Sequence, residues 1–385
     1  MKRQVGALAQ ASLGDTAQKY AMDGEVQGPH SGPMESFENL VRTEFAPKTT
    51  YLNTASTGLL PARTLVAMRD AAASAAAGLP SDMFADVEAS RSAFARIVGV
   101  PATRVAAGAS VATYTGLVAA SLPEGAEVLT AEADFSSLVN PLHMRGDLKV
   151  RSVPLERIAE SVGPQTALVA VSAVQSADGR IADLAALRDA ARAHGARTLI
   201  DASQSNGWLP LAADDFDYVA AVAYKWALCP RGVAFLVVPE DLGESAGLTP
   251  LFAGWASGEH PWDSCYGRVE ELAHSARRFD ESPALFSYTG ARHSLALIEE
   301  LGVEAVHAHD TALADRFRAG LGSLGHEPVP APGSAIVSVP GLGHRQEELG
   351  RAGVQVSDRA GNLRAAFHLY NTAADVDRLL DVLAG

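Results

Sequence analysis

Short apolar runs alternate with helix-forming segments through the middle of this chain, and this alternation limits the possible folds more than any other feature. The runs comprise residues 127–130, 168–172, 197–201, 218–222 and 233–238. Between two of them, segment 183–192 places Leu184, Leu187 and Ala191 on one helical face. Strand–helix–strand alternation predicts an α/β fold with a largely parallel central sheet, covered by helices on both faces.

Beyond about residue 255 the pattern changes. A helix is predicted over 292–301, a strand over 335–339 and a closing helix over 375–383, with proline and glycine interrupting the chain at 328–333. This mixture predicts a smaller C-terminal α+β domain. We therefore expect four parts, which are a flexible tail (1–35), a segment packing with the small domain (36–60), a large domain (61–255) and a small domain (256–385).

Composition excludes several classes of partner. The chain has 31 basic and 45 acidic residues among 385, a formal charge of −14, so its field would repel nucleic acid and anionic membranes. No apolar stretch approaches the ~18 residues of a membrane span. Two cysteines cannot build a disulfide framework, and Gln10, Ser12 and Asp15 interrupt the apolar N-terminal stretch too early for a secretion signal. We expect a cytoplasmic protein.

Polar residues follow two of the apolar runs. Asp201 ends run 197–201 with Gln204 three residues later, and Lys225 follows run 218–222. Ligands of parallel sheets bind at the carboxyl ends of strands. The aromatic neighbours of Lys225 predict partial desolvation, which lowers the pKa of an amine and makes it a nucleophile. Taken alone, such a lysine is more often a solvent-exposed charge, and such an aspartate is more often a helix cap or turn residue.

Five segments in order carry a resemblance to a known family. They are residues 51–56, 108–110, 201–204, 224–233 and 363–372. Together they resemble the class V branch of fold-type I pyridoxal-phosphate enzymes, which includes cysteine desulfurases, kynureninases, isopenicillin-N-epimerase-like proteins and ergothioneine-pathway C–S lyases. The resemblance implies the fold-type I architecture, pyridoxal 5'-phosphate as cofactor, an amino acid substrate and a homodimer.

The resemblance also implies roles around the cofactor ring. Lys225 would form the Schiff base with the cofactor aldehyde, and Asp201 would pair with the pyridine nitrogen. Gln204 would hydrogen-bond the phenolic oxygen, with Ser176 near that oxygen. Phe135 occupies the place of the aromatic side chain that stacks on the ring, although such a residue is also typical of a core.

For the phosphate, the resemblance implies the backbone amides of Ala109 and Ser110 at a helix N-terminus. The hydroxyl of Tyr224 would reach the phosphate as in kynureninases, and Ser282 would approach the neighbouring subunit's site. The chain departs from many relatives because Ala109 replaces a hydroxyl residue. It departs from desulfurases because Tyr224 and Val222 stand where those enzymes have His and Ser.

For the substrate, Arg364 stands where the family places the arginine that binds the carboxylate. Arg359 is a second candidate, Ser56 lies in the first matching segment, and Trp255 would approach the neighbouring subunit's site. Asp358 could instead hold either arginine in a structural ion pair.

The lack of a cysteine in one segment narrows the set of reactions that the sequence favours. Cysteine desulfurases carry a nucleophilic cysteine on a loop before the substrate arginine, whereas residues 357–364 contain none; Cys229 and Cys265 lie elsewhere. The interpretation we favour is a lyase that breaks the C–S bond of an S-substituted cysteine by β-elimination, through a lysine Schiff base and a quinonoid intermediate.

Other functions stay open at this point. An aminotransferase, an epimerase and a decarboxylating enzyme would share the same first step. A degenerate cofactor domain acting as a ligand sensor is a non-enzymatic alternative. A metal hydrolase using His194, His274 or His368 is disfavoured, because the sequence has no HxH or HExxH spacing, and no metal is expected.

Overall fold

The structure is a computed structural model that describes residues 33–241 and 247–385. The chain divides into two units, Met1–Asn39 and Leu40–Gly385, and the second contains the sheets and the candidate site. Helix α1 (Pro33–Glu44) begins inside the range predicted as a tail, and the rest of that tail lies outside the described residues. Among the described residues, no helix combines the length and apolar character needed to cross a membrane.

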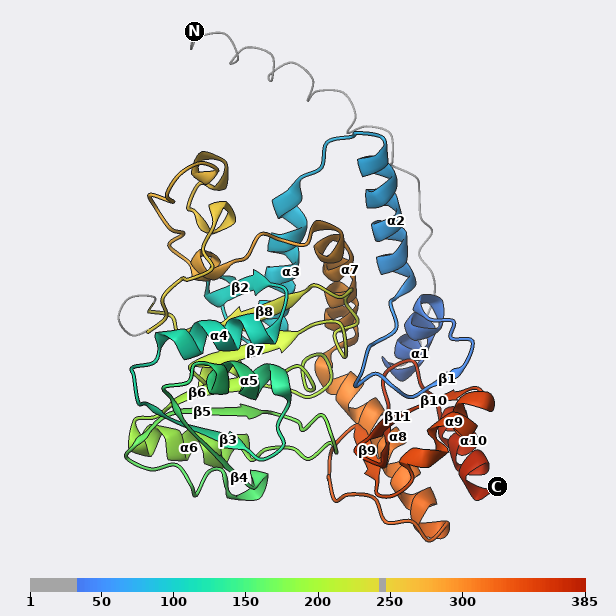
Figure 1. Ribbon diagram of the computed structural model, residues 1–385. Helices are drawn as coiled ribbons and strands as arrows, with labels where there is room; N and C mark the ends of the chain where they lie inside the picture. Colours follow the sequence, from blue (N-terminus) through green and yellow to red (C-terminus); the bar gives the residue numbers. More distant parts are fainter. Residues whose placement is uncertain (1–32, 242–246) are drawn as a thin grey trace. The chain divides into compact units, whose positions relative to one another are not determined.

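A central sheet of seven strands confirms the predicted α/β fold (Figure 1). In order across the sheet, the strands are β2 (Val105–Gly108), β8 (Ala234–Val237), β7 (Tyr218–Val222), β6 (Arg197–Asp201), β5 (Thr166–Ser172), β3 (Glu127–Ala131) and β4 (Lys149–Val153). All neighbours are parallel except β8, which runs antiparallel to both β2 and β7. The sheet is therefore mostly parallel, with one reversed strand near an edge.

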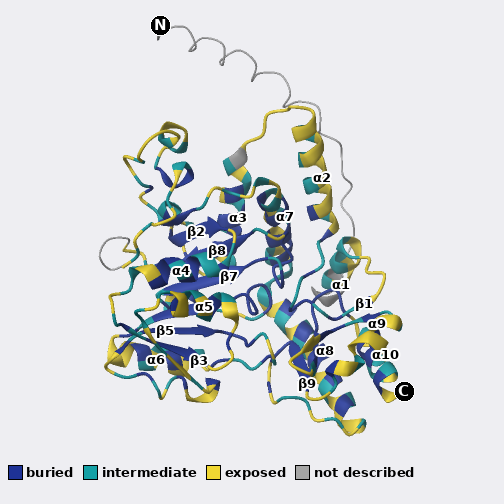
Figure 2. Ribbon diagram, in the orientation of Figure 1, coloured by how far each residue is buried: buried dark blue, intermediate teal, exposed yellow. Residues whose placement is uncertain are grey.

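Helices cover both faces of this sheet. One face packs against α3 (Met83–Ile97), α6 (Leu184–His194) and α7 (Leu285–Leu301), and the other against α4 (Val111–Ser121) and α5 (Ser136–Met144). Successive residues of a strand point to opposite faces, so Val169 joins the first core and Leu168 the second. Because both faces are buried, the inner strands read as continuous apolar runs. Figure 2 shows β5 and β7 buried, whereas the edge strand β4 is largely exposed.

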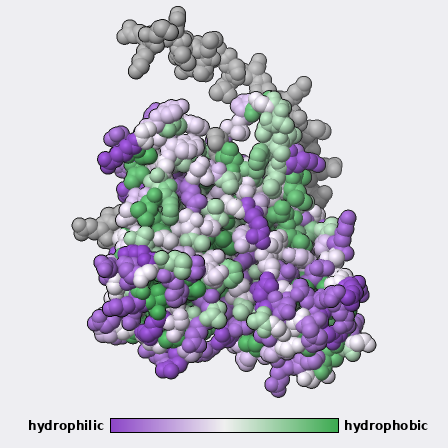
Figure 3. Space-filling model, in the orientation of Figure 1, coloured by the Kyte–Doolittle hydropathy of each residue, from purple (hydrophilic) through white to green (hydrophobic). Residues whose placement is uncertain are grey.

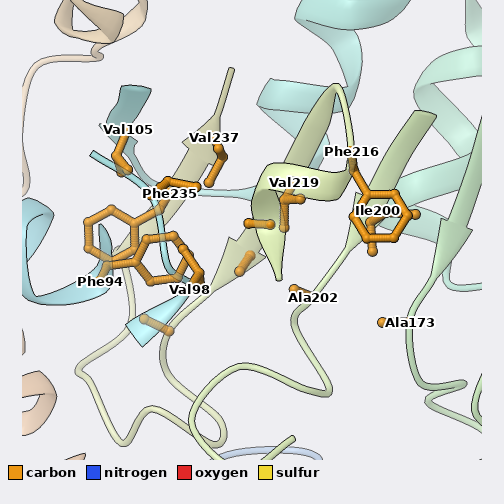
Figure 4. Close-up of a cluster of buried hydrophobic side chains, with 14 of the residues drawn as sticks. Phe94, Val98, Val105, Ala173, Ile200, Ala202, Phe216, Val219, Phe235 and Val237 are labelled. Carbon is orange, nitrogen blue, oxygen red and sulfur yellow. The ribbon is translucent and has the colours of Figure 1, made fainter. Parts of the chain in front are cut away.

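The first of these cores centres on aromatic packing. The ring of Phe94 from α3 stacks on that of Phe235 from β8, with centroids 4.4 Å apart (Figure 4). Val105 and Val219 come from the neighbouring strands β2 and β7, and Val237 comes from β8 itself. Burial of each such side chain stabilises the fold by roughly 1.5–3 kcal/mol. The core thus holds the strand ends that carry the polar residues in fixed positions.

A second, antiparallel sheet lies in the C-terminal part of the chain. It has the order β11 (Ser357–Arg359), β12 (Asn362–Ala366), β9 (Ile336–Val339), and it packs against α8 (Val303–Ser323) and α10 (Ala373–Ala384). Strand β1 (Thr50–Tyr51), which precedes α2 (Ala62–Ala76), pairs in parallel with β10 (Val354–Gln355), which follows the short helix α9 (Gln346–Arg351). The predicted domain boundaries stay a prediction.

Candidate active site

Lys225 lies three residues beyond the carboxyl end of β7 and is only 4% exposed. The other two lysines in the described residues, Lys48 and Lys149, are exposed. The turn around Lys225 is tightly packed, because a Cβ on Gly58 would lie 2.0 Å from the Lys225 carbonyl oxygen. Burial lowers the pKa of the Lys225 amine to about 8, against the opposing attraction of Asp201. The amine is therefore prepared to act as a nucleophile near neutral pH.

Asp201 ends the neighbouring strand β6 and is buried. Its Oδ1 accepts a hydrogen bond of 2.8 Å from the backbone N–H of Ser203. Burial raises the pKa of this carboxyl, while the bond from Ser203 and the charge of Lys225 oppose that rise. A buried carboxylate in this position favours a cationic partner, such as a protonated pyridine nitrogen.

Gln204 brings Ser176 into the same cluster. Its Nε2 donates to Ser176 Oγ and to the carbonyl of Ala55, each at 2.9 Å. Its Oε1 accepts a bond of 2.8 Å from the indole of Trp226, the residue after Lys225. The side-chain amide is thus held firmly beside the lysine turn, and its bond to a cofactor oxygen stays a prediction.

The N-terminus of α4 faces the same cavity. Ser110 is the N-cap residue, and its Oγ accepts a bond of 3.2 Å from the N–H of Thr113. Ala109 and Ser110 line the cavity together with Asp201 and Lys225. Helix N-termini offer unpaired N–H groups and a positive dipole end to a phosphate.

Phe135 presents its ring toward the lysine. The ring centroid lies 5.0 Å from Lys225 Nζ, and the side chain is 41% exposed, so it is not a core residue. Asp134, which is buried, accepts the Phe135 N–H at 2.7 Å and the Ser172 N–H at 2.8 Å. This carboxylate therefore fixes the backbone that carries the ring. Sequence reasoning missed Asp134, although an acidic residue soon after the buried strand β3 was a signal for it.

Tyr224 and Arg231 form a further part of the wall of the cavity around Lys225. The guanidinium of Arg231 lies 4.2 Å from the centroid of the Tyr224 ring, and its Nη2 donates to Thr57 Oγ1 at 3.0 Å. Both side chains line the cavity. Arg231 lies within the matching segment 224–233, and its role was not predicted from the sequence.

The cavity has a volume of about 240 Å³. It brings a buried amine, a buried carboxylate and a helix N-terminus together, which are the groups that an aldehyde, a pyridinium nitrogen and a phosphate require. Gly108 ends β2, two residues before the N-cap of α4. A Cβ at this position would lie 2.6 Å from Tyr114 Oη, so the chain needs glycine there. The residues present therefore fit pyridoxal phosphate.

Arg364 is a buried cation on β12, only 1% exposed. Its Nη2 donates to Ser56 Oγ at 2.8 Å, and its Nη1 donates to the carbonyl and the hydroxyl of Ser176. Burial, and then the charge of Arg359, lowers the pKa of Arg364 to about 9. No carboxylate in residues 33–241 and 247–385 forms an ion pair with Arg364. Because a buried cation favours an anionic partner, Arg364 is a candidate for binding a substrate carboxylate.

Arg359 converges on the same hydroxyl. Its Nη2 donates to Ser56 Oγ at 2.9 Å, so Ser56 joins both arginines. The carboxylate of Asp358 instead accepts the N–H of Gly361 at 2.8 Å. The structure thus gathers Ser56, Arg359 and Arg364 beside Ser176.

Two predicted residues lie apart from this cluster. Trp255 packs against Phe84 and Trp262, with ring centroids 5.6 and 5.3 Å away. Ser282 is exposed. Neither lines the cavity around Lys225. Both were predicted to act at a neighbouring subunit's site, and those roles stay predictions.

The lowered pKa of Lys225 has a measurable consequence. The rate at which the apoprotein forms a Schiff base with added pyridoxal phosphate should rise with pH and level off above about 8, because only the neutral amine attacks the aldehyde. Stopped-flow absorbance between pH 6 and 10 would measure this rate. An N-acetyl-lysine amide control titrates near its ordinary pKa of about 10.4, so its rate should still be rising at pH 10. A protein profile that follows the control would contradict the lowered pKa.

Comparisons with known proteins agree with this geometry. A sequence profile of the family "Aminotransferase class-V" matches residues 50–379. The chain is 29% identical over 383 residues to isopenicillin N epimerase of Amycolatopsis lactamdurans, covering 88% of this chain and 95% of that protein. It is 27% identical over 314 residues to an uncharacterised aminotransferase of Bacillus subtilis (strain 168), covering 77% and 83%.

Solved structures agree on the fold. A cystine C–S lyase in complex with its product cysteine persulfide superposes with a TM-score of 0.79 at 23% identity, covering 88% of this chain and 97% of that one. Cysteine desulfurase CsdA of Escherichia coli superposes with a TM-score of 0.78 at 19% identity, covering 92% and 98%. The family match spans most of the chain and the cavity fits the cofactor, so this chain belongs to the class V aminotransferase family and is a pyridoxal-phosphate-dependent enzyme of fold type I.

Proposed function

We propose that this enzyme cleaves the C–S bond of an S-substituted cysteine by β-elimination. One water is consumed, and the products are a thiol, pyruvate and ammonium. The observation that carries this proposal is the form of the hairpin just before Arg364, together with the placement of both cysteines.

The hairpin between β11 and β12 is closed by two residues. Arg359 pairs with Asn362 across it, and the turn residues Ala360 and Gly361 have φ values of 53° and 84°. Such a left-handed pair is typical of a tight two-residue turn. This turn therefore lacks the cysteine-bearing loop that desulfurases, which this chain resembles, use to take up sulfur.

Neither cysteine of the chain replaces that nucleophile. Cys229 is buried in the core, where burial raises the pKa of its thiol and suppresses the thiolate. Cys265 is exposed, and its Sγ lies near the carbonyl oxygen of Pro261 at 3.6 Å. Neither lines the cavity around Lys225. We infer that sulfur leaves with the departing thiol instead of passing to the protein.

The residues around Lys225 suit this elimination. Pyridoxal phosphate supplies the electron sink that stabilises negative charge at the substrate's α-carbon. Lys225 Nζ, with a pKa near 8, removes the α-proton as a general base. Asp201 holds positive charge on the ring nitrogen, and Arg364 holds the substrate carboxylate so that the α-proton faces Lys225.

A second candidate has its own support. Isopenicillin N epimerase matches across 88% of this chain, and an epimerase would return a proton to the opposite face of the α-carbon. Transamination would instead return it to the cofactor. The products distinguish these reactions.

The test is to incubate holoenzyme with a panel of S-alkyl- and S-aryl-cysteines. We expect pyruvate, ammonia and thiol in equal amounts without any added keto acid. S-methylcysteamine, which lacks the carboxylate, is the matched control and should turn over at least about 100-fold more slowly, because Arg364 is left unpaired. Keto acid formed only with an added acceptor would indicate transamination, and racemisation without thiol release would indicate epimerisation. Either result would overturn the lyase proposal.

We also propose that the enzyme is a homodimer. Large apolar side chains are exposed on α2, where Leu65 and Val66 are 52% and 47% accessible, and Figure 3 shows apolar colouring over this helix. Exposed apolar surface of this kind is typical of an interface. Sedimentation should give a mass near twice 40.1 kDa. A mass near 40 kDa at assay concentration would contradict the dimer.

A further inference from the structure

We propose that His368, held by Asp310, is a positioning residue for Lys225 and acts by fixing the peptide that follows this lysine. The inference rests on the cofactor chemistry of the family and not on which bond of the substrate is broken.

His368 and Asp310 form a pair that is completely buried. His368 follows β12, Asp310 lies on α8, and both side chains are 0% exposed. His368 Nδ1 lies 2.8 Å from Asp310 Oδ2, and His368 Nε2 lies 2.8 Å from the backbone carbonyl oxygen of Trp226. The imidazole therefore bridges α8 and the turn that carries Lys225.

The hydrogen-bond chemistry fixes the proton on one side of the ring. A carbonyl oxygen only accepts, so His368 Nε2 must carry a hydrogen and donate it to Trp226. The contact between Nδ1 and Asp310 Oδ2 needs a second proton, which the two groups share. Asp310 thus keeps His368 in the state that donates toward the lysine turn, as carboxylates do for imidazoles elsewhere.

The buried pair of His368 and Asp310 carries costs for the stability of the fold. Asp310 Oδ1 is buried and has no hydrogen-bond partner among the described residues. An unpartnered buried acceptor destabilises a protein, because its desolvation is not compensated. Burial also raises the pKa of Asp310, against the attraction of His368. An apolar pair of similar volume would pack here without these costs, which points to a role beyond stability.

Trp226 connects the pair to the reacting groups. It directly follows Lys225, and its carbonyl is held by His368. Its indole Nε1 donates to Gln204 Oε1 at 2.8 Å. The residue next to the lysine is therefore fixed at both its backbone and its ring. A displacement of about 1 Å at such a position can lower a rate about 100-fold.

Two variants of His368 separate its two hydrogen bonds. In His368→Gln the side-chain amide reaches the place of Nε2, so the bond to Trp226 is kept and that to Asp310 is lost. In His368→Asn the shorter amide reaches only the place of Nδ1, so the bond to Asp310 is kept and that to Trp226 is lost. Each variant removes one of the two hydrogen bonds of the buried His368 side chain, so we expect similar losses of folding stability in both.

The readouts are independent of the substrate's leaving group. They are the pH midpoint of the absorbance change of the Lys225 Schiff base in the holoenzyme, and the dissociation constant of pyridoxal phosphate. For His368→Asn we expect a midpoint shift of at least about half a pH unit, a threefold change in the protonation equilibrium. We also expect cofactor binding that is about tenfold weaker. For His368→Gln we expect values within about threefold of the wild type.

Phe317→Leu is the control for loss of packing, because Phe317 lies on α8 and packs against Phe367 with centroids 5.6 Å apart. It should lower the melting temperature and leave both readouts unchanged. The proposal fails if the asparagine and glutamine variants behave alike, or if Phe317→Leu shifts the midpoint as much as His368→Asn. Wild-type-like spectra in the asparagine variant would also overturn it, even if the C–S lyase assay succeeds.

Discussion

Replacement of Lys225 by alanine is expected to abolish covalent attachment of pyridoxal phosphate and to lower kcat by at least about 10⁴-fold. A general base alone contributes about 10²–10⁴-fold, and the alanine variant also loses the amine that receives and releases the cofactor aldehyde. None of the other residues that line the cavity is a lysine, so no second amine of this kind is beside the cofactor site. Borohydride reduction followed by peptide mapping would measure attachment, and steady-state assays would measure kcat.

Lys149→Ala is the matched control, because Lys149 is an exposed lysine at the start of the edge strand β4. This variant should retain the labelled peptide that contains Lys225 and a kcat near that of the wild type. A reduced adduct on another lysine of the wild type would contradict the assignment of Lys225. So would an alanine variant that still turns over an amino acid at a comparable rate.

Most strands of the central sheet could be predicted from apolar runs, but β2 was missed although its residues are buried, because it is short and ends in glycine. Strands β6 and β7 match the predicted apolar runs residue for residue, because a strand buried on both faces must be apolar throughout. Strand β4 was missed since it lies at the edge and carries exposed polar residues such as Lys149 and Arg151. The reversed direction of β8 was also missed, because an apolar run does not record the direction of its strand.

Some residues of the candidate site could likewise be predicted from the sequence, and others could not. Lys225 and Asp201 could be singled out because each lies at or shortly after the end of a recognisable strand and belongs to a matching segment. Asp134 and the pair of His368 with Asp310 could not be assigned roles. Their partners lie far away in sequence, 38 residues for Asp134 with Ser172 and 58 for the pair. Such contacts arise only when the strands and helices pack, so periodicity and local spacing do not reveal them.

Asp201→Asn is expected to leave Schiff-base formation intact and to lower kcat between about 10²- and 10⁴-fold. The amide keeps the size of the side chain but removes the buried negative charge that we propose holds a proton on the pyridine nitrogen. Breaking a buried charge pair costs about 3–5 kcal/mol, and about 1.36 kcal/mol corresponds to a tenfold change in rate. The neutral ring accepts electrons poorly, so abstraction of the α-proton slows while binding of the substrate carboxylate at Arg364 is unaffected.

Steady-state kinetics with the best substrate of the cysteine panel would measure this loss, and borohydride mapping would show that Lys225 is still labelled. Asp217→Asn is a suitable control, because Asp217 accepts the Thr198 N–H at 2.9 Å and so supports β6 without lining the cavity. A retained adduct with a large loss of kcat separates the electronic role of Asp201 from a role in folding, since a misfolded site would lose both. If Asp201→Asn kept a wild-type kcat, the carboxylate would not control the ring charge, and abstraction of the proton would have to depend on Lys225 and Arg364 alone.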